Sequence, residues 1–294
     1  MVRDVQSERP ENSFPLTKVG VRGVLKPVQV SRPGRTVTLP TSFDVYVDIP
    51  ATQRGSHLSR HLEVIEEVVD ASVRTPVAGL EDLAGAIAVE LLDRHETASN
   101  SEVWARADYF LERVSPWGRK SLEPYRLVAK ATAARARPVA THKAIGVEVV
   151  GMTACPCAME MVRADLEARE PGVKLPKGFP TITHNQRNRT TVILDVPEGA
   201  DVEADDLIEI VESSQSAPTY ELLKRPEEGR LVEAAHRKPR FVEDVVREVL
   251  ARILKRYKGL PDAARVSVKS ESEESIHKHN AFAERTTTLG ELRA

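Results

Sequence analysis

The sequence predicts an α+β protein made of two units, each with the order strand, strand, helix, helix, strand, strand. Segments rich in β-branched residues occur on either side of segments with helical apolar spacing. The same order recurs in the second half of the 294-residue chain, without visible sequence identity between the halves. Two such units would form one antiparallel sheet with helices on one face.

The first unit is expected over residues 18–150, after a flexible polar arm at residues 1–17. Four of its segments have the β-branched content of strands: residues 19–30, 35–50, 101–114 and the region around 142–152. Two segments carry apolar residues at helical spacing, Ser59–Ala71 and Leu80–His95.

The second unit is expected over residues 151–294 and contains most of the chemically distinctive motifs. A strand is predicted over residues 188–197, followed by helices over Ala204–Glu212 and Pro239–Tyr257. A closing strand pair within residues 264–288 is interrupted by a polar loop. Residues 167–180 contain three prolines and two glycines, which predicts a loop.

Composition excludes several classes of function. Lys plus Arg is 42 and Asp plus Glu is 44, so the formal charge of −2 gives no broad footprint for nucleic acid or a membrane surface. We see neither a signal peptide nor about 20 consecutive apolar residues, the length of a membrane span. We therefore expect a cytoplasmic protein.

Both cysteines of the chain lie in the segment GMTACPCA, as Cys155 and Cys157. This pair cannot complete a tetrahedral structural zinc site, because such a site needs four protein ligands and the chain has no other cysteine. The pair can chelate a soft metal, form a redox couple or supply one ligand beside an inert neighbour. Two buried thiols without chemistry are an equally good interpretation of these residues alone.

Three polar clusters accompany the cysteines. His184 lies in THNQR directly before a predicted strand, and His277 and His279 alternate in IHKH, which places both rings on one side of an extended segment. Paired histidines suit metal binding or proton transfer, although exposed loops also carry such clusters. In QRGSHLSR, residues 53–60, the start of a helix offers N–H groups to an anion, or Ser59 simply caps that helix.

Taken in order, the segments RGSHLSR, GMTACPCAME, THNQR, YELLKRPEEGRLVE, KPRFVEDVVREV and SESEESIHKHNAFA resemble the type IB GTP cyclohydrolase family, and within it the archaeal branch. The resemblance runs from about residue 18 to the C-terminus. It implies the tunnelling fold, in which subunits associate so that their sheets close into a barrel. It therefore also implies a homo-oligomer, a dimer or tetramer, with active sites at subunit interfaces.

The resemblance also implies roles for individual residues. Cys155, His184 and, less directly, Glu233 match the metal ligands, whereas Cys157 matches a second cysteine of secondary role. The implied metal is Fe(II), and a mixed sulfur, nitrogen and oxygen ligand set also accepts zinc or manganese.

Other matched residues concern the substrate. His277 and His279 match catalytic histidines, and Glu248, with Glu243 as the alternative, matches a carboxylate that holds the purine ring. The candidates for binding the triphosphate are basic side chains: Arg187, Lys224, Arg225 and Arg54.

The implied reaction converts GTP to 7,8-dihydroneopterin 2′,3′-cyclic phosphate with release of formate and diphosphate, the first step of methanopterin-type pterin biosynthesis. The alternative product is 7,8-dihydroneopterin triphosphate. A nitrile reductase of the same fold is disfavoured by the histidine pair and by HNQR. A purine- or pterin-binding oligomer without catalysis is the alternative from another class.

Overall fold

The strands form one antiparallel sheet, as the sequence analysis predicted, and the structure gives it nine strands. The computed structural model describes residues 4–32, 35–170, 172, 174–176 and 178–294. In the sheet the strand order is β1-β2-β3-β4-β5-β6-β8-β9, and the two-residue strand β7 pairs with β5. The chain clusters into two compact units, the first mainly residues 1–109 and 126–145 and the second mainly residues 110–125, 146–194 and 201–294.

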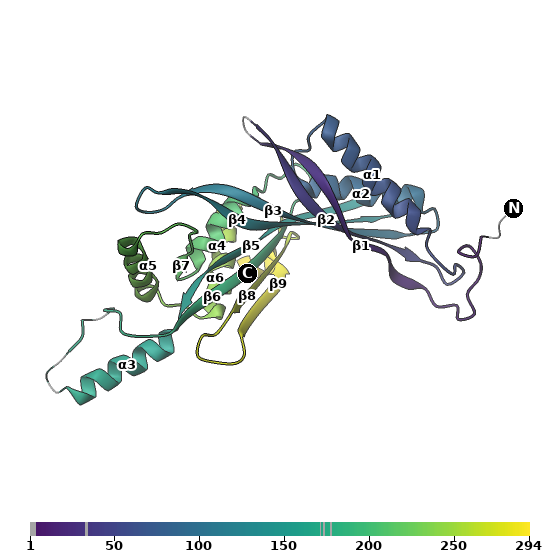
Figure 1. Ribbon diagram of the computed structural model, residues 1–294. Helices are drawn as coiled ribbons and strands as arrows, with labels where there is room; N and C mark the ends of the chain where they lie inside the picture. The colour runs from purple at the N-terminus through teal and green to yellow at the C-terminus, as the bar shows by residue number, and fades with distance from the viewer. Residues whose placement is uncertain (1–3, 33–34, 171, 173, 177) are drawn as a thin grey trace. The chain divides into compact units, whose positions relative to one another are not determined.

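The first unit is built from a strand pair and two helices (Figure 1). Strands β1 (Leu16–Arg32) and β2 (Arg35–Ile49) pair along most of their length, and helices α1 (Leu58–Arg74) and α2 (Leu80–Arg94) pack against them and each other. Strands β3 (Asn100–Val114) and β4 (Lys120–Ala134) follow. The helices bury one face each, and the largest fully buried side chains there are Ile65, Leu80, Leu83, Ile87, Leu91 and Leu92.

The second unit contains the remaining strands and helices. They are β5 (Ala140–Ala154), α3 (Pro156–Arg169), β6 (Asn185–Asp195), α4 (Ala204–Ser214), β7 (Ala217–Pro218), α5 (Arg225–Arg237), α6 (Val242–Arg256), β8 (Arg265–Ser272), β9 (Ala281–Thr288) and α7 (Leu289–Arg293). Helix α6 packs on β8, β9 and α4. With β5 and β6 before them, α4, α6, β8 and β9 repeat the strand, strand, helix, helix, strand, strand order.

Five elements were not expected from the sequence: strands β4 and β7 and helices α3, α5 and α7. Figure 1 shows α3 continuing from the end of β5, and only Met159 of this helix is buried. The predicted helices over residues 59–71, 80–95, 204–212 and 239–257 are all present, with ends that differ by up to three residues. The predicted loop at residues 167–180 was wrong for residues 167–169, which belong to α3; the described remainder follows the helix, and residues 171, 173 and 177 lie outside the described part of the chain.

The segment before β1 contacts the loop that precedes α1. Backbone N–H groups of Arg54 and Gly55 donate to the carbonyls of Glu8 and Gln6, at 2.8 and 3.0 Å. The Gln6 amide also donates to the Ser56 carbonyl at 3.1 Å. At Gln6 and Glu8 the predicted arm is therefore hydrogen-bonded to the first unit, whereas residues 1–3 lie outside the described residues.

The pairing of β6 with β8 divides one buried face into a polar and an apolar half. Asn188 lies opposite Ser272 and Thr190 opposite Ser270, whereas the pairs farther along β6 are valines and leucine: Val192 with Val268 and Leu194 with Val266. All eight of these residues are at most 1% exposed. The apolar half anchors the strand in the core, and the polar half leads toward His184, directly before the strand.

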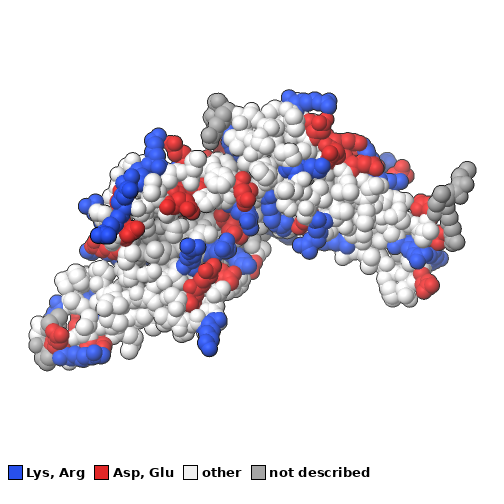
Figure 2. Space-filling view, in the orientation of Figure 1, with Lys and Arg blue, Asp and Glu red and all other residues white. Residues whose placement is uncertain are grey.

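Charge is mixed over the visible surface. Figure 2 shows lysines and arginines interspersed with acidic residues on that face, in keeping with the near-neutral formal charge. Among the described residues, every helix is too short or too polar to span a lipid bilayer.

Candidate active site

Cys155 lies where β5 ends and α3 begins. It is the N-cap of α3, and its Sγ accepts a hydrogen bond from the Ala158 N–H at 3.5 Å. Pro156 suits this first turn, because its missing N–H would have no partner there. The N-terminus of a helix favours negative charge, so this position suits a thiolate that binds a metal.

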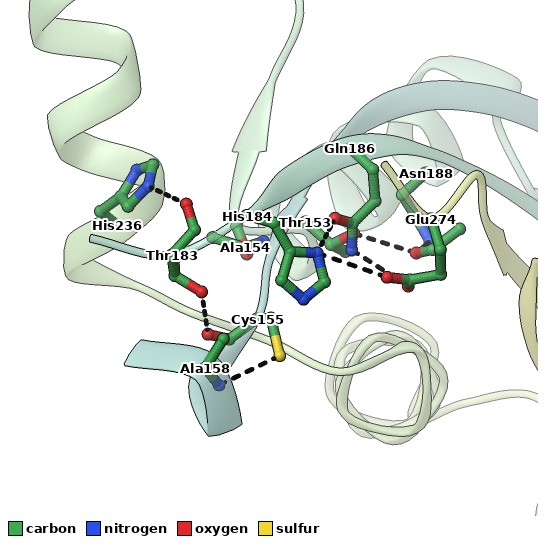
Figure 3. A network of polar contacts seen from close by, with 12 residues as sticks. Thr153, Ala154, Cys155, Ala158, Thr183, His184, Gln186, Asn188, His236 and Glu274 are labelled. Atoms are coloured by element: carbon green, nitrogen blue, oxygen red, sulfur yellow. Dashed lines mark hydrogen bonds and ion pairs between the residues drawn. The ribbon is translucent and has the colours of Figure 1, made fainter. Parts of the chain in front are cut away.

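The backbone places His184 beside Cys155. The Cys155 N–H donates to the His184 carbonyl at 3.1 Å, and the Thr183 hydroxyl donates to the Cys155 carbonyl at 2.7 Å. Figure 3 shows the Cys155 sulfur and the His184 ring as neighbours at this junction. The structure thus brings together two of the three residues that the sequence analysis predicted as metal ligands.

The His184 ring has a defined tautomer. Its Nδ1 lies 2.9 Å from Oε1 of Gln186, whose Nε2 donates to Thr153 Oγ1 at 3.2 Å and to Glu274 Oε1 at 3.1 Å. The opposite orientation of the amide would face its oxygen toward the Glu274 carboxylate, so the network fixes Oε1 as the acceptor. With Oε1 as the acceptor, His184 Nδ1 is the donor of this bond, and a neutral ring then offers its Nε2 lone pair to a metal.

Glu274 adds a carboxylate behind the same ring. It follows β8, its Oε2 lies 3.5 Å from His184 Nδ1, and its side chain is only 12% exposed. A carboxylate behind a ligating histidine orients the ring and increases its basicity. The sequence analysis missed the roles of Gln186 and Glu274, because Glu274 is one of several acidic residues in SESEES and no spacing distinguishes it.

A series of buried hydrogen bonds among Thr153, Ser272, Asn188 and Gln215, called the ladder, connects the site to the interior of the second unit. Thr153 Oγ1 contacts Ser272 Oγ at 2.9 Å, and Asn188 Nδ2 donates to Ser272 Oγ at 3.0 Å. The Gln215 amide donates to Asn188 Oδ1 at 3.0 Å. A Cβ on Gly151 would lie 1.8 Å from Gln215 Oε1, so a side chain there would force Gln215 to shift. The ladder restricts the positions of Thr153 and Gln186, which in turn hold His184.

The connection between α5 and α6 forms another side of the site. The Arg240 N–H donates to the Ala154 carbonyl at 3.0 Å, one residue before Cys155. His236 Nε2 lies 3.4 Å from the Thr183 carbonyl. Residues 236–240 therefore lie against the segments that carry both Cys155 and His184, which nothing in the sequence indicated.

Glu248, predicted to hold the purine ring, already has cationic partners on both oxygens. Its Oε1 accepts from Arg252 Nε at 2.8 Å, and its Oε2 lies 3.7 Å from Arg240 Nη1. Glu243, the alternative, is exposed in the first turn of α6 and has no ion pair within the described residues.

Glu233 is not beside the other two predicted ligands. It lies on the exposed surface of α5, where its Oε1 accepts from Arg237 Nε and Nη2 at 2.8 and 2.6 Å. Within the described residues, no group of three His, Cys, Asp or Glu side chains is close enough to hold a metal ion. The donor chemistry of Cys155 and His184 fits a divalent metal such as Fe(II) or zinc, with a third ligand still to be supplied.

The remaining predicted residues are exposed. His277 and His279 lie in the loop between β8 and β9, where their rings stack with centroids 5.0 Å apart. Cys157 is exposed in the first turn of α3. Lys224 and Arg225 lie at the start of α5 and Arg187 on β6, and all three are exposed; Arg54 belongs to the loop before α1.

Solved structures that share this fold identify the fold class of the protein. Urate oxidase from Bacillus sp. TB-90 matches with a TM-score of 0.54 at 11% identity, over 93% of this chain and 99% of its own. Uricase from Arthrobacter globiformis matches with a TM-score of 0.51 at 9% identity, over 93% of each chain. At these identities the likeness concerns architecture alone, and it places the chain among tunnelling-fold proteins.

The sequence narrows this class to one family. The family described as type I GTP cyclohydrolase folE2 matches residues 2–283, so the chain belongs to the type I GTP cyclohydrolases. GTP cyclohydrolase MptA 2 of Methanocella arvoryzae is 42% identical over 99% of this chain and 97% of its own length. GTP cyclohydrolase MptA of Methanococcoides burtonii is 43% identical over 99% and 95%.

Proposed function

We propose that this protein is a metal-dependent GTP cyclohydrolase that converts GTP to 7,8-dihydroneopterin 2′,3′-cyclic phosphate, formate and diphosphate. The observation that supports the metal-dependent part is the position of the His184 ring next to Cys155, with Gln186 bonded to Nδ1 and not to Nε2 (Figure 3). The archaeal relatives named MptA support the place of the reaction at the start of methanopterin-type pterin synthesis.

In this proposal Cys155 and His184 hold a divalent ion, with Fe(II) as the physiological metal. When bound, such an ion would act as a Lewis acid that activates water for hydrolysis. Glu233 is proposed as the third ligand, which requires it to leave its ion pair with Arg237 and to move toward Cys155 and His184. Zinc or manganese is expected to substitute, because the ligand set mixes sulfur, nitrogen and oxygen.

Protein side chains supply the remaining steps. His277 and His279 are proposed to transfer protons as the imidazole ring of guanine opens and formate leaves, and their exposed loop gives them access to a bound substrate. A carboxylate on α6 accepts hydrogen bonds from the guanine N–H groups, which distinguishes guanine from adenine. The free carboxylate of Glu243 suits this contact better than Glu248, whose oxygens already face arginines.

We further propose that the protein works in the cytoplasm as a homo-oligomer, a dimer or tetramer. Strands β1 and β9 end the strand order, and an edge strand with unpaired backbone groups favours pairing with another chain. Each edge carries an exposed apolar side chain, Leu25 on β1 and Phe282 on β9. Light scattering of the purified protein tests this part, and a monomer would contradict it.

Formate release tests the function itself. The protein is loaded with Fe(II) without oxygen, incubated with GTP, and assayed for formate, while mass spectrometry counts the phosphates of the pterin product. One phosphate identifies the cyclic phosphate, and three identify 7,8-dihydroneopterin triphosphate. Tight binding of GTP without release of formate would indicate a purine-binding oligomer without catalysis instead of an enzyme.

A further inference from the structure

Three cationic side chains converge on one carboxylate in the second unit. Glu248 of α6 accepts a hydrogen bond from Arg252, one turn along the helix, at 2.8 Å. The Arg240 guanidinium, two residues before α6, lies 3.7 Å from the other oxygen of Glu248. Lys238 lies close enough to both arginines and to Glu248 for their charges to affect its titration. We call Lys238, Arg240 and Arg252 the basic cluster.

The basic cluster has more positive charge than its surroundings neutralise. Three cations face one carboxylate, and the Lys238 ammonium otherwise donates to a neutral acceptor, the Ser213 carbonyl, at 2.6 Å. Arg240 Nε is buried and has no hydrogen-bond partner among the described residues. Buried donors without partners are costly, and most are satisfied in a working protein. Among the described residues, the cluster therefore has one carboxylate, Glu248, for three cations, and it can accept a further anion.

The titration of Lys238 agrees with this excess of positive charge. Burial, followed by the nearby charges of Arg240 and Arg252, lowers the pKa of Lys238 to about 8, and Glu248 opposes the change. An additional anion at this position would reverse part of that effect, because it stabilises the charged ammonium.

The basic cluster adjoins the candidate active site. The Arg240 N–H donates to the Ala154 carbonyl, and Ala154 precedes Cys155. A substrate whose purine reaches the Cys155 and His184 junction therefore has the cluster within the same surface region. By contrast, Lys224 and Arg225 lie at the other end of α5 from residues 236–240.

We propose that Lys238, Arg240 and Arg252 bind the phosphate chain of the nucleotide substrate, while Glu248 holds the two guanidinium groups in position. This assignment rests on the proposed function and gives it a phosphate subsite. Guanidinium groups bind phosphate oxygens through paired hydrogen bonds, and an ammonium adds a point charge. Glu248 then acts as a positioning residue for the arginines, and the purine contact is left to Glu243.

Comparison of GTP with guanosine tests the subsite. In Arg240→Gln and Arg252→Gln we expect the KM for GTP to rise about 10-fold to 100-fold, because each loses a charge-assisted contact. The inhibition constant of guanosine, which lacks phosphates, should stay within about 2-fold. Arg252→Lys keeps the charge and should recover part of the loss, which separates binding from folding. Arg247→Gln, on the exposed side of α6, is the matched control and should leave both constants unchanged.

Two results would overturn the assignment: an unchanged KM for GTP in both variants, or an equal rise in the guanosine inhibition constant. If wild-type protein releases no formate, the proposed function fails, and equilibrium dialysis with radiolabelled GTP and guanosine still tests the basic cluster. Weaker binding of GTP but not guanosine in Arg240→Gln would then uphold the subsite, and equal binding of GTP by both proteins would reject it.

Discussion

His184 donates its Nδ1 proton to Gln186 Oε1 across 2.9 Å, two residues along the same strand segment. The Nε2 group of Gln186 donates to Thr153 and Glu274, so its Oε1 is the atom that accepts from His184. One side-chain amide therefore decides which imidazole nitrogen is available to a metal.

We expect Glu274→Gln to weaken metal binding about 10-fold to 100-fold, as is typical when a carboxylate behind a ligating histidine is lost. Competition with a coloured chelator measures this affinity without turnover. Glu273→Gln is the matched control, because Glu273 is 53% exposed and 3.9 Å from Arg189. Equal affinity in the two variants would contradict a role for Glu274 in orienting His184.

The two cysteines should behave differently. Cys155→Ser exchanges a soft thiolate for a hydroxyl at the N-cap of α3, so we expect loss of bound Fe(II) and of formate release with little change in helix content. Cys157→Ser changes an exposed side chain and should retain at least about half of the metal. Metal analysis and circular dichroism provide the readouts; similar metal loss in both variants would make Cys157 a ligand.

The roles of Glu243 and Glu248 can be separated in the same way. Glu243→Gln should weaken guanosine inhibition about 10-fold or more, because it removes a charge-assisted contact to the base. Glu248→Gln should raise the KM for GTP and leave guanosine inhibition unchanged, since it only releases Arg240 and Arg252. The reverse pattern would return the purine contact to Glu248.

A buried histidine pair should make the first unit sensitive to acid. His61 and His95 are 0% and 4% exposed, their ring centroids are 4.4 Å apart, and both nitrogens of His61 and Nε2 of His95 have no hydrogen-bond partner among the described residues. Burial lowers the pKa of both rings, and that of His95 falls from 6.5 to about 4, with contributions from His61, Arg60 and His57. The carbonyls of His57 and Val19 near the His61 ring oppose the change.

Proton linkage gives the direction in which the free energy of unfolding changes with pH. The unfolded chain binds these protons more tightly, so the pair costs no stability above about pH 6.5, and the free energy of unfolding falls as the pH drops from about 6.5 to about 4. For His95 alone the loss approaches about 3 kcal/mol. Urea midpoints at pH 7.5 and pH 5, at one protein concentration, measure it. His95→Gln should reduce the difference, whereas exposed His277→Gln should not; equal differences would disprove the prediction.

Hydrophobic periodicity predicted those elements in which the apolar residues recur at the positions that the structure buries. Helix α6 has the apolar spacing that predicts its buried face, and it lies within the expected range. Strand β4 was missed because it contains Pro124 and because its second half is rich in alanine, two residue types that are depleted in strands. Helix α5 was missed because Pro226 and Gly229 resemble turn signals, although proline suits a first helical turn.

For the site, local motifs indicated residues but not their partners. The HNQR motif identified His184, and the fold places it beside Cys155. The contacts with Glu274 and Arg240 depend on strand pairing and on the α5 to α6 connection, which no local spacing encodes. The predicted ligand Glu233 is on the surface of α5, paired with Arg237, and its role is still a prediction.

The exposure of Cys157 makes it a natural attachment point for a reporter. The chain has two thiols, and a maleimide dye or nitroxide should react first with the exposed one. A probe placed there sits two residues from Cys155 on the first turn of α3, so its fluorescence or electron spin resonance would monitor metal loading and substrate arrival in real time.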